Sequence, residues 1–174
     1  MKITVDTQTL SKALYRVQGV ADKKSTMPIL AHVLLNASDD GKLVVSATDL
    51  DVGLSGSYDI EVQEAGSVAI HAKQLYEVVK SLPAGELQLT REENHWVSIQ
   101  AGSSKFKLVG MAADEFPAMP SHNQIKTFSI PGSLLNRMVE RTIFCVSTDD
   151  NRHNLSGIYV EAAEDKKLRM VATD

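Results

Sequence analysis

The chain has 174 residues, of which 43% are hydrophobic and 23% charged, and its formal net charge is −4. The composition is typical of an ordinary globular protein, and the length suits one large domain or one domain plus part of another. A membrane span and an internal disulfide are excluded, because no apolar run is long enough and Cys145 is the only cysteine. The N-terminus has no signal-peptide pattern, so we expect a cytoplasmic protein.

The chain begins with a strand, a helix and further strands. Residues 2–5 (KITV) alternate as a short strand, and residues 7–20 follow with a helical period. The apolar positions of this helix are Leu10, Ala13, Leu14 and Val17. Their spacing predicts an amphipathic helix with one face on a sheet. Strand-like runs follow at 28–37 and 42–60, separated by a turn at 39–41.

The same order of elements recurs 65 residues further along the chain. Residues 68–82 (VAIHAKQLYEVVKSL) again predict a strand and a helix, which ends before Pro83. Residues 86–111 then predict three strands, with a tight turn near residues 92–94. The repeating unit is therefore strand, helix, three strands. Two such units form a predicted first domain over residues 1–120.

A third copy begins after a predicted linker at 121–125. The stretch 162–174 (AAEDKKLRMVATD) matches 37–49 (ASDDGKLVVSATD) at seven of thirteen positions, and the offset of 125 holds back to the pair Val5 and Ile130. Residues 126–174 therefore predict the first half of a second domain: a strand at 127–130, a helix at 132–146 that includes Cys145, and at most three strands.

Half a domain buries too little apolar surface for stability and leaves an unpaired strand edge. We therefore expect the chain to be a truncated fragment. The alternative is that its last fifty or so residues pack on the first domain as an extension.

Positive charge collects on the predicted helices. The segments 7–24, 72–82 and 132–146 carry net charges of +3, +1 and +1, which leaves −9 for the remainder. Lys12 and Arg16 lie four residues apart on one helix face, and Arg137 and Arg141 repeat them at the offset of 125. Such a surface on an acidic protein favours a polyanion, bound through its phosphates independently of sequence. The alternative is that these cations are ordinary solvated side chains.

Two other classes of function stay open. Asp49 and Asp51 would share one face of a strand, and with Asp149 and Asp150 they offer oxygen ligands for magnesium or calcium in a hydrolase. However, no histidine stands at ligand spacing to these acids, and no phosphate loop or nucleophile elbow is present. We therefore predict no catalytic residue, metal or cofactor. A structural, self-assembling sheet protein would share the fold, but it gives no reason for repeated cations.

Six short motifs are individually modest but specific in their order and spacing. They are MKITV (1–5), TMPILAHVLL (26–35), SATDLDVGL (46–54), DEFPAMP (114–120), NLSGIYVE (154–161) and LRMVATD (168–174). Together they resemble the bacterial DNA polymerase III beta subunit family, the sliding clamps, over the whole chain. The resemblance implies an α+β DNA-clamp fold, with an antiparallel sheet and the helices of repeated strand-helix-three-strand units on one face.

The resemblance also implies a function and an assembly. Members have three domains of like fold, and two subunits join head to tail in a ring whose helices surround duplex DNA. The ring tethers the replicative polymerase and confers processivity without catalysing a reaction. The present chain would hold the first domain and half of the second, and we expect it not to form a ring by itself.

The resemblance also implies DNA-binding roles for individual residues. Lys24 and Lys73 stand where the family places basic DNA contacts. The loop 147–155 matches a DNA-contacting loop, with His153 and Asn154 where some relatives carry aromatic residues. Asp149 replaces a neutral amide there, and an acid disfavours phosphate contact.

Two protein-binding sites are also implied. Leu155 and Thr173 match part of the pocket that binds peptides of polymerase and clamp-loader subunits. Phe106 and Leu108 resemble the edge strand of the homodimer interface, for which simple strand packing is the alternative.

Overall fold

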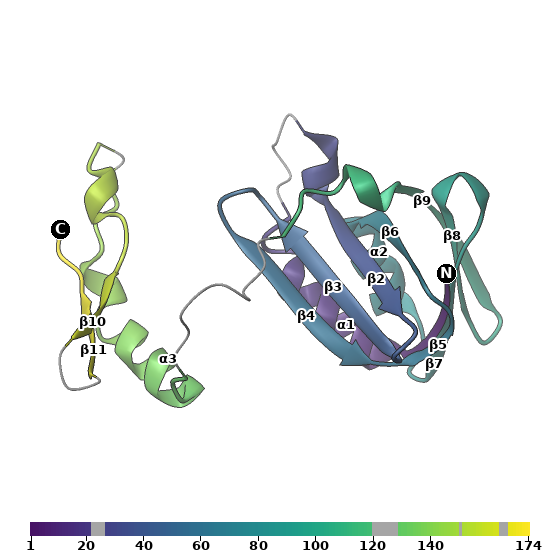
Figure 1. Ribbon diagram of the computed structural model, residues 1–174, viewed down its shortest axis with the longest axis horizontal. Helices are drawn as coiled ribbons and strands as arrows, with labels where there is room; N and C mark the ends of the chain where they lie inside the picture. Colours follow the sequence, from purple (N-terminus) through teal and green to yellow (C-terminus); the bar gives the residue numbers. More distant parts are fainter. Residues whose placement is uncertain (22–26, 120–128, 150, 164–166) are drawn as a thin grey trace. The chain divides into compact units, whose positions relative to one another are not determined.

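The computed structural model describes residues 1–21, 27–119, 129–149, 151–163 and 167–174 (Figure 1). The chain divides into two units, Met1–Pro120 and Ser121–Asp174. Lys24 and the predicted linker at 121–125 lie outside the described residues. Among the described helices, none is long and apolar enough to cross a membrane.

The first unit contains two successive strand-helix-three-strand repeats. The first repeat consists of β1 (Lys2–Asp6), α1 (Thr7–Val17), β2 (His32–Ser38), β3 (Lys42–Thr48) and β4 (Gly53–Asp59). The second consists of β6 (Gly66–His71), α2 (Ala72–Ser81), β7 (Glu86–Arg91), β8 (Trp96–Ala101) and β9 (Ser104–Met111). A short strand between them, β5 (Glu61–Glu64), is an addition to the predicted elements, and short 3₁₀ turns η1 (Pro28–Ala31), η2 (Glu93–His95) and η3 (Ala113–Glu115) complete the unit.

The strands form one antiparallel sheet in the order β4-β3-β2-β6-β9-β8-β7-β1-β5. The two repeats exchange their first strands, because β6 pairs with β2 and β1 pairs with β7. The two halves of the sheet meet through only two residue pairs, Ala69 with Met111 and Ile70 with Gly110. Each repeat therefore completes the sheet of the other. The prediction of an antiparallel α+β fold is confirmed.

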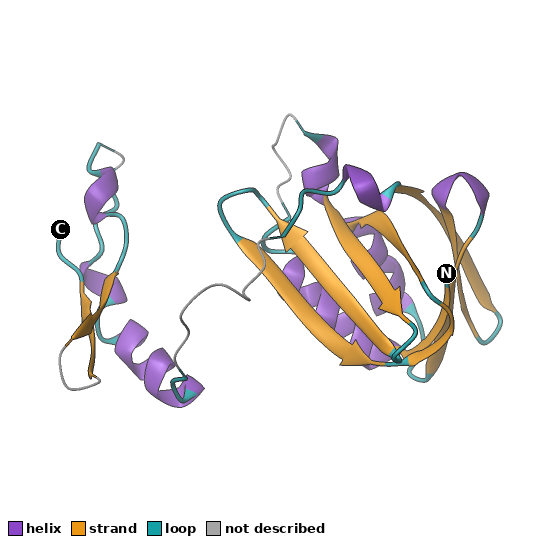
Figure 2. Ribbon diagram, viewed as in Figure 1, coloured by secondary structure: helices purple, strands orange, loops and turns teal. Residues whose placement is uncertain are grey.

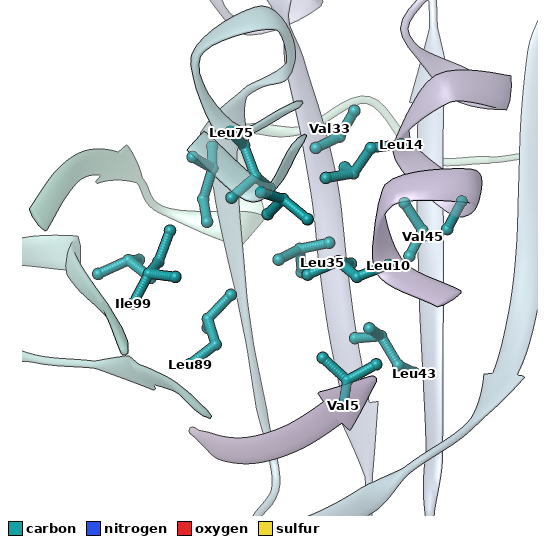
Figure 3. Close-up of a cluster of buried hydrophobic side chains, with 14 of the residues drawn as sticks. Val5, Leu10, Leu14, Val33, Leu35, Leu43, Val45, Leu75, Leu89 and Ile99 are labelled. Atoms are coloured by element: carbon teal, nitrogen blue, oxygen red, sulfur yellow. The ribbon is translucent and has the colours of Figure 1, made fainter. Parts of the chain in front are cut away.

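Both helices pack on the same face of this sheet (Figure 2). Asp6 begins α1 as its N-cap, since its Oδ2 accepts a hydrogen bond of 2.8 Å from the Thr9 backbone N–H. The four predicted apolar positions of α1 are buried, each at most 1% exposed. They pack against β2 and β3 residues such as Leu35 and Val45 in a core shared by both repeats (Figure 3).

The second unit repeats the first half of this pattern with the predicted offset. It contains α3 (Gly132–Glu140), β10 (Tyr159–Ala163) and β11 (Lys167–Val171), and 3₁₀ turns η5 (Ile143–Cys145) and η6 (His153–Leu155). Helix α1 begins at residue 7 and α3 at 132, while β3 begins at residue 42 and β11 at 167. Strands β10 and β11 pair as an antiparallel hairpin.

Two predictions for this unit are wrong. Ser129 and Ile130 are not in a strand, and the other half of that predicted strand lies outside the described residues. In the first unit, β1 pairs with β5 and β7, which both come after the last strand of its own repeat. The described part of the second unit contains no equivalent of β5 or β7, so Ser129 and Ile130 have no such strand to pair with. Helix α3 also ends at Glu140 rather than continuing, which leaves Cys145 half-buried in a 3₁₀ turn.

Two histidines lie side by side where the sheet meets η1 and α2: His32 follows η1, and His71 is the N-cap residue of α2. His32 and His71 are directly paired across β2 and β6, with ring centroids 5.6 Å apart. His32 Nδ1 donates to the Pro28 carbonyl at 2.8 Å, and His71 Nδ1 accepts from the Gln74 backbone N–H at the start of α2. Burial, and then the neighbouring His71, lower the pKa of His32, while the Pro28 carbonyl and Glu115 oppose this.

This lowered pKa predicts a loss of stability in mild acid. As the pH falls from about 7.5 through the unfolded value of 6.5, the unfolded chain binds a proton before folded His32 does, so the free energy of unfolding decreases. We expect His32→Asn to flatten the pH dependence of urea unfolding between about pH 7.5 and 5.5. His153→Asn, which removes an exposed histidine of the second unit, is measured beside it as the control for loss of an imidazole. Equal slopes for all three proteins would contradict the assignment to His32.

Candidate functional site

The face of α1 that points away from the sheet carries Lys12 and Arg16. Both side chains are exposed, whereas Ala13 and Leu14 between them are buried. The four-residue spacing stacks the two cations one above the other on the helix. No acid among the described residues forms an ion pair with either of them. Both charges are therefore available to an anionic partner.

Helix α2 lies antiparallel beside α1. The end of α2 and the start of α1 line a groove of about 340 Å³. The groove residues are Thr7, Gln8, Ser11, Lys12, Val79, Lys80, Leu82 and Ala84. Further along, the rings of Tyr15 and Tyr76 pack with their centroids 6.2 Å apart. Lys12 and Lys80 thus flank one groove although they are far apart in sequence.

We call the exposed surface of these two helices the helix face; its residues are Lys12, Tyr15, Arg16, Lys73, Tyr76 and Lys80. Together α1 and α2 contain four cations and a single acid, Glu77, which makes them +3 on a chain of −4. The Lys80 ammonium lies 5.6 Å from the Tyr76 ring centroid, a cation–π contact that orients it on this face. A positive surface on an acidic protein directs a polyanion to that surface alone.

Lys80 and the two tyrosines were missed as site residues by the sequence analysis. Lys80 entered only as part of a helix charge, because the 65-residue repeat pairs it with Tyr15 rather than with a cation. A usable signal was present in the spacing of Tyr76 and Lys80, which lie one turn apart.

Arg137 and Arg141 occupy the equivalent face of α3 in the second unit. Arg137 lies in the last turn of the helix, and Arg141 is its C-cap residue, whose backbone N–H donates to the Arg137 carbonyl. Both side chains are exposed, and no described acid pairs with them. Cations at this end also interact favourably with the helix dipole. The local placement of the two arginines therefore reproduces that of Lys12 and Arg16.

In the loop 147–155 the two end residues are hydrogen-bonded to each other, and Asp149 is paired with a cation. The Ser147 backbone N–H donates to the Leu155 carbonyl at 3.0 Å. Asp149 Oδ1 accepts from the Asn151 backbone N–H, and its Oδ2 lies 3.6 Å from Arg152 Nε. Arg152 thus offsets the negative charge that was expected to disfavour phosphate, and the sequence analysis did not include it. His153 and Asn154 are exposed beside this pair.

Leu155 and Thr173 are not brought together in the apolar groove of this unit. Leu155 is half-buried and Thr173 is exposed. The groove measures about 480 Å³, and neither residue lines it. Its lining residues are Ser129, Ile130, Pro131, Leu134, Met138, Lys167 and Leu168.

Phe106 and Leu108 lie on the part of β9 that has a strand on one side only. Residues 104–109 pair with β8, and β6 pairs with β9 only at Gly110 and Met111. Leu108 packs at the margin of the core, whereas Phe106 is 39% exposed. Among the described residues, this stretch thus keeps unpaired backbone groups along one edge.

Among the acids considered for a metal site, Asp49 has a structural role instead, and Asp150 lies outside the described residues. Asp49 and Asp51 lie in the turn between β3 and β4, not on a strand. Asp49 Oδ1 accepts from the backbone N–H groups of Asp51 and Val52, at 3.1 and 2.7 Å. This is the usual way in which an aspartate closes a turn. Within the described ranges, no group of three or more His, Cys, Asp or Glu residues is placed to hold a metal.

Comparison with known proteins gives one consistent family. Residues 1–120 match the family described as DNA polymerase III beta subunit, N-terminal domain. The whole chain is 37% identical to the beta sliding clamp of Caulobacter vibrioides, of which it covers 48%, and 35% identical to that of Pseudomonas aeruginosa, of which it covers 47%. The chain therefore spans about half the length of the curated relatives it matches.

Solved structures agree with the sequence matches. The chain matches the crystal structure of the DNA polymerase sliding clamp from Caulobacter crescentus with a TM-score of 0.90 and 36% identity, over the whole chain and 48% of that structure. The sliding clamp from Bacillus subtilis gives a TM-score of 0.94 at 28% identity, over the whole chain and 47% of that structure.

Proposed function

Because the chain belongs to the family of the DNA polymerase III beta subunit, we propose that it acts in a DNA sliding clamp, a non-catalytic processivity factor of DNA replication. The clamp surrounds duplex DNA and tethers the replicative polymerase to it. The chain spans 48% of a curated relative. Ring closure and polymerase binding are therefore proposed by analogy with the whole proteins of that family.

The helix face is the observation that supports contact with DNA. Its cations lie on α1 and α2, two antiparallel helices that lie side by side on the same face of the sheet. None of these cations forms an ion pair with a described acid. Lysine and arginine on such a surface contact phosphates and carry no sequence information. Tyr15 and Tyr76 pack on each other rather than standing as separate stacking platforms. Sequence-independent contact with the duplex backbone therefore fits this surface better than base reading.

Two protein partners are also proposed, for other parts of the chain. The unpaired edge of β9 at Phe106 and Leu108 suits head-to-tail association of two subunits, since a strand edge binds another strand through its free backbone groups. Leu155 and Thr173 are proposed to contribute to the pocket for peptides of polymerase and clamp-loader subunits. The loop 147–155 is proposed as a further phosphate contact, because Arg152 offsets Asp149.

A salt titration of duplex binding tests the proposed function. With about four phosphate contacts from the helix face, the logarithm of the binding constant should fall linearly with the logarithm of salt concentration, with a slope near −4. Fluorescence anisotropy with A·T-rich and G·C-rich duplexes of equal length should give equal affinities. Binding that is insensitive to salt, or a preference above about tenfold for one duplex, would contradict backbone contact.

A further inference from the structure

Lys80 lies beside an aromatic ring rather than beside an acid. Its ammonium is 5.6 Å from the ring centroid of Tyr76, which lies one turn earlier on α2. Glu77 precedes Lys80 by three residues, which is the other spacing at which helix side chains meet. The described structure nevertheless forms no ion pair between Lys80 and Glu77. The ring therefore holds Lys80 and leaves its charge for an anionic partner.

Tyr76 is itself held by its surroundings. It is half-buried and packs at the margin of the core of the first unit. The ring of Tyr15, on α1, lies 6.2 Å from it at an interplanar angle of 44°, which is a favourable arrangement for two aromatic rings. The Lys80 side chain has a flexible stem by comparison, so Tyr76 provides it with a fixed support.

The support matters because of where Lys80 lies. Lys80 lines the groove between α1 and α2 together with Lys12 of the other helix. A lysine side chain that moves freely loses conformational entropy when it is fixed on a phosphate. A lysine that is already oriented in the free protein loses less entropy, so more of its phosphate contact appears as affinity.

We propose that Tyr76 is a positioning residue for duplex binding, which acts on the DNA backbone only through Lys80. The ring orients the Lys80 ammonium at the groove, where Lys80 and Lys12 contact phosphates from two helices. This inference rests on the proposed function, because it concerns how the helix face holds the duplex. It gives an aromatic residue a role that the charge pattern of the helices does not contain.

A double-mutant cycle on duplex affinity tests the proposal. Lys80→Ala removes one phosphate contact and should weaken binding about tenfold at low salt, with a salt slope smaller in magnitude by about one. Tyr76→Leu keeps an apolar side chain on the core but removes the ring. It should weaken binding about two- to fivefold, the usual effect of a cation–π contact at an exposed site. In the Lys80→Ala background, Tyr76→Leu should have no further effect on affinity.

Two matched variants separate positioning from other roles of the tyrosine. Tyr76→Phe keeps the ring and removes only the hydroxyl, so it should bind duplex as the wild type does. Among the described residues, no ring makes a cation–π contact with Lys12. In the Lys12→Ala background, Tyr76→Leu should therefore show its full two- to fivefold loss. A purely structural role of Tyr76 would give the same loss in the Lys12→Ala and Lys80→Ala backgrounds.

Three results would overturn the proposal while wild-type binding stays salt-dependent. The first is a Tyr76→Leu loss that is equal with and without Lys80, and the second is no loss at all. The third is a Tyr76→Phe loss as large as that of Tyr76→Leu, which would mean that the hydroxyl contacts DNA directly. A wild-type chain without salt-dependent binding would instead contradict the proposed function, and the role of Tyr76 with it.

Discussion

Replacing Lys12 and Arg16 together by glutamate is expected to reduce the affinity for duplex DNA by more than ~30-fold at low salt. Both cations lie on the outer face of α1, are exposed and have no described acidic partner. The substitutions remove two phosphate contacts and place two carboxylates beside the groove that Lys80 flanks. The salt slope should therefore also decrease in magnitude by about two.

A charge-matched control separates the helix face from net charge. Lys42 of β3 and Lys105 of β9 are exposed cations on strands. Their joint replacement by glutamate changes the charge by the same amount and should lower the affinity less than about threefold, with an unchanged salt slope. Anisotropy titrations of both double variants at several salt concentrations give the comparison. Equal losses would mean that DNA responds to overall charge, and the helix face would lose its role.

The elements that could be predicted are those whose signal is local. The apolar spacing of Leu10, Leu14 and Val17 lies within one helix, and Asp6 caps that helix three residues away from its hydrogen-bond donor. The offset of 125 placed the start of α3 at the residue equivalent to the start of α1. Such features depend on neighbours along the chain, so the repeat reveals them without knowledge of the packing.

The exchange of first strands could not be predicted in the same way. The alternation of residues 2–5 indicates a strand but does not say which strand it pairs with, and β1 pairs with β7 and β5 rather than with its own repeat. The strand predicted at Ser129 and Ile130 was wrong for the same reason, because the pattern does not show whether a partner strand is present, and these residues lack the partner that β1 has. Register and partner are set by the whole sheet, not by a period of two.

The residues of the candidate site also differ in whether a local signal could predict them. Lys12 and Arg16 were found because their face follows from a helical period. The proximity of Lys80 to Lys12 depends on how α1 packs against α2, which the period of neither helix contains. The pairing of Asp149 with Arg152 depends on the closure of a loop, so the acid alone was misleading about local charge.

Leu35→Ala is expected to lower the free energy of unfolding by about 2–5 kcal/mol, the largest stability effect we predict. Leu35 is fully buried on β2, beside Leu10 of α1 and opposite Val68 of β6 (Figure 3). It therefore touches the core contributed by both repeats, and the cavity left by alanine is lined by rigid strands that cannot close on it.

The neighbouring position on the same strand shows whether this loss comes from burial. Asn36 is exposed on the opposite side of β2, and Asn36→Ala should change the free energy of unfolding by less than about 0.5 kcal/mol in the same urea titrations. Since the core of the first unit joins the two repeats, Leu35→Ala should shift one cooperative transition of that unit rather than separate it into two. A separate early transition of either repeat, or equal losses in the two variants, would mean that the repeats do not share the core that supports the helix face.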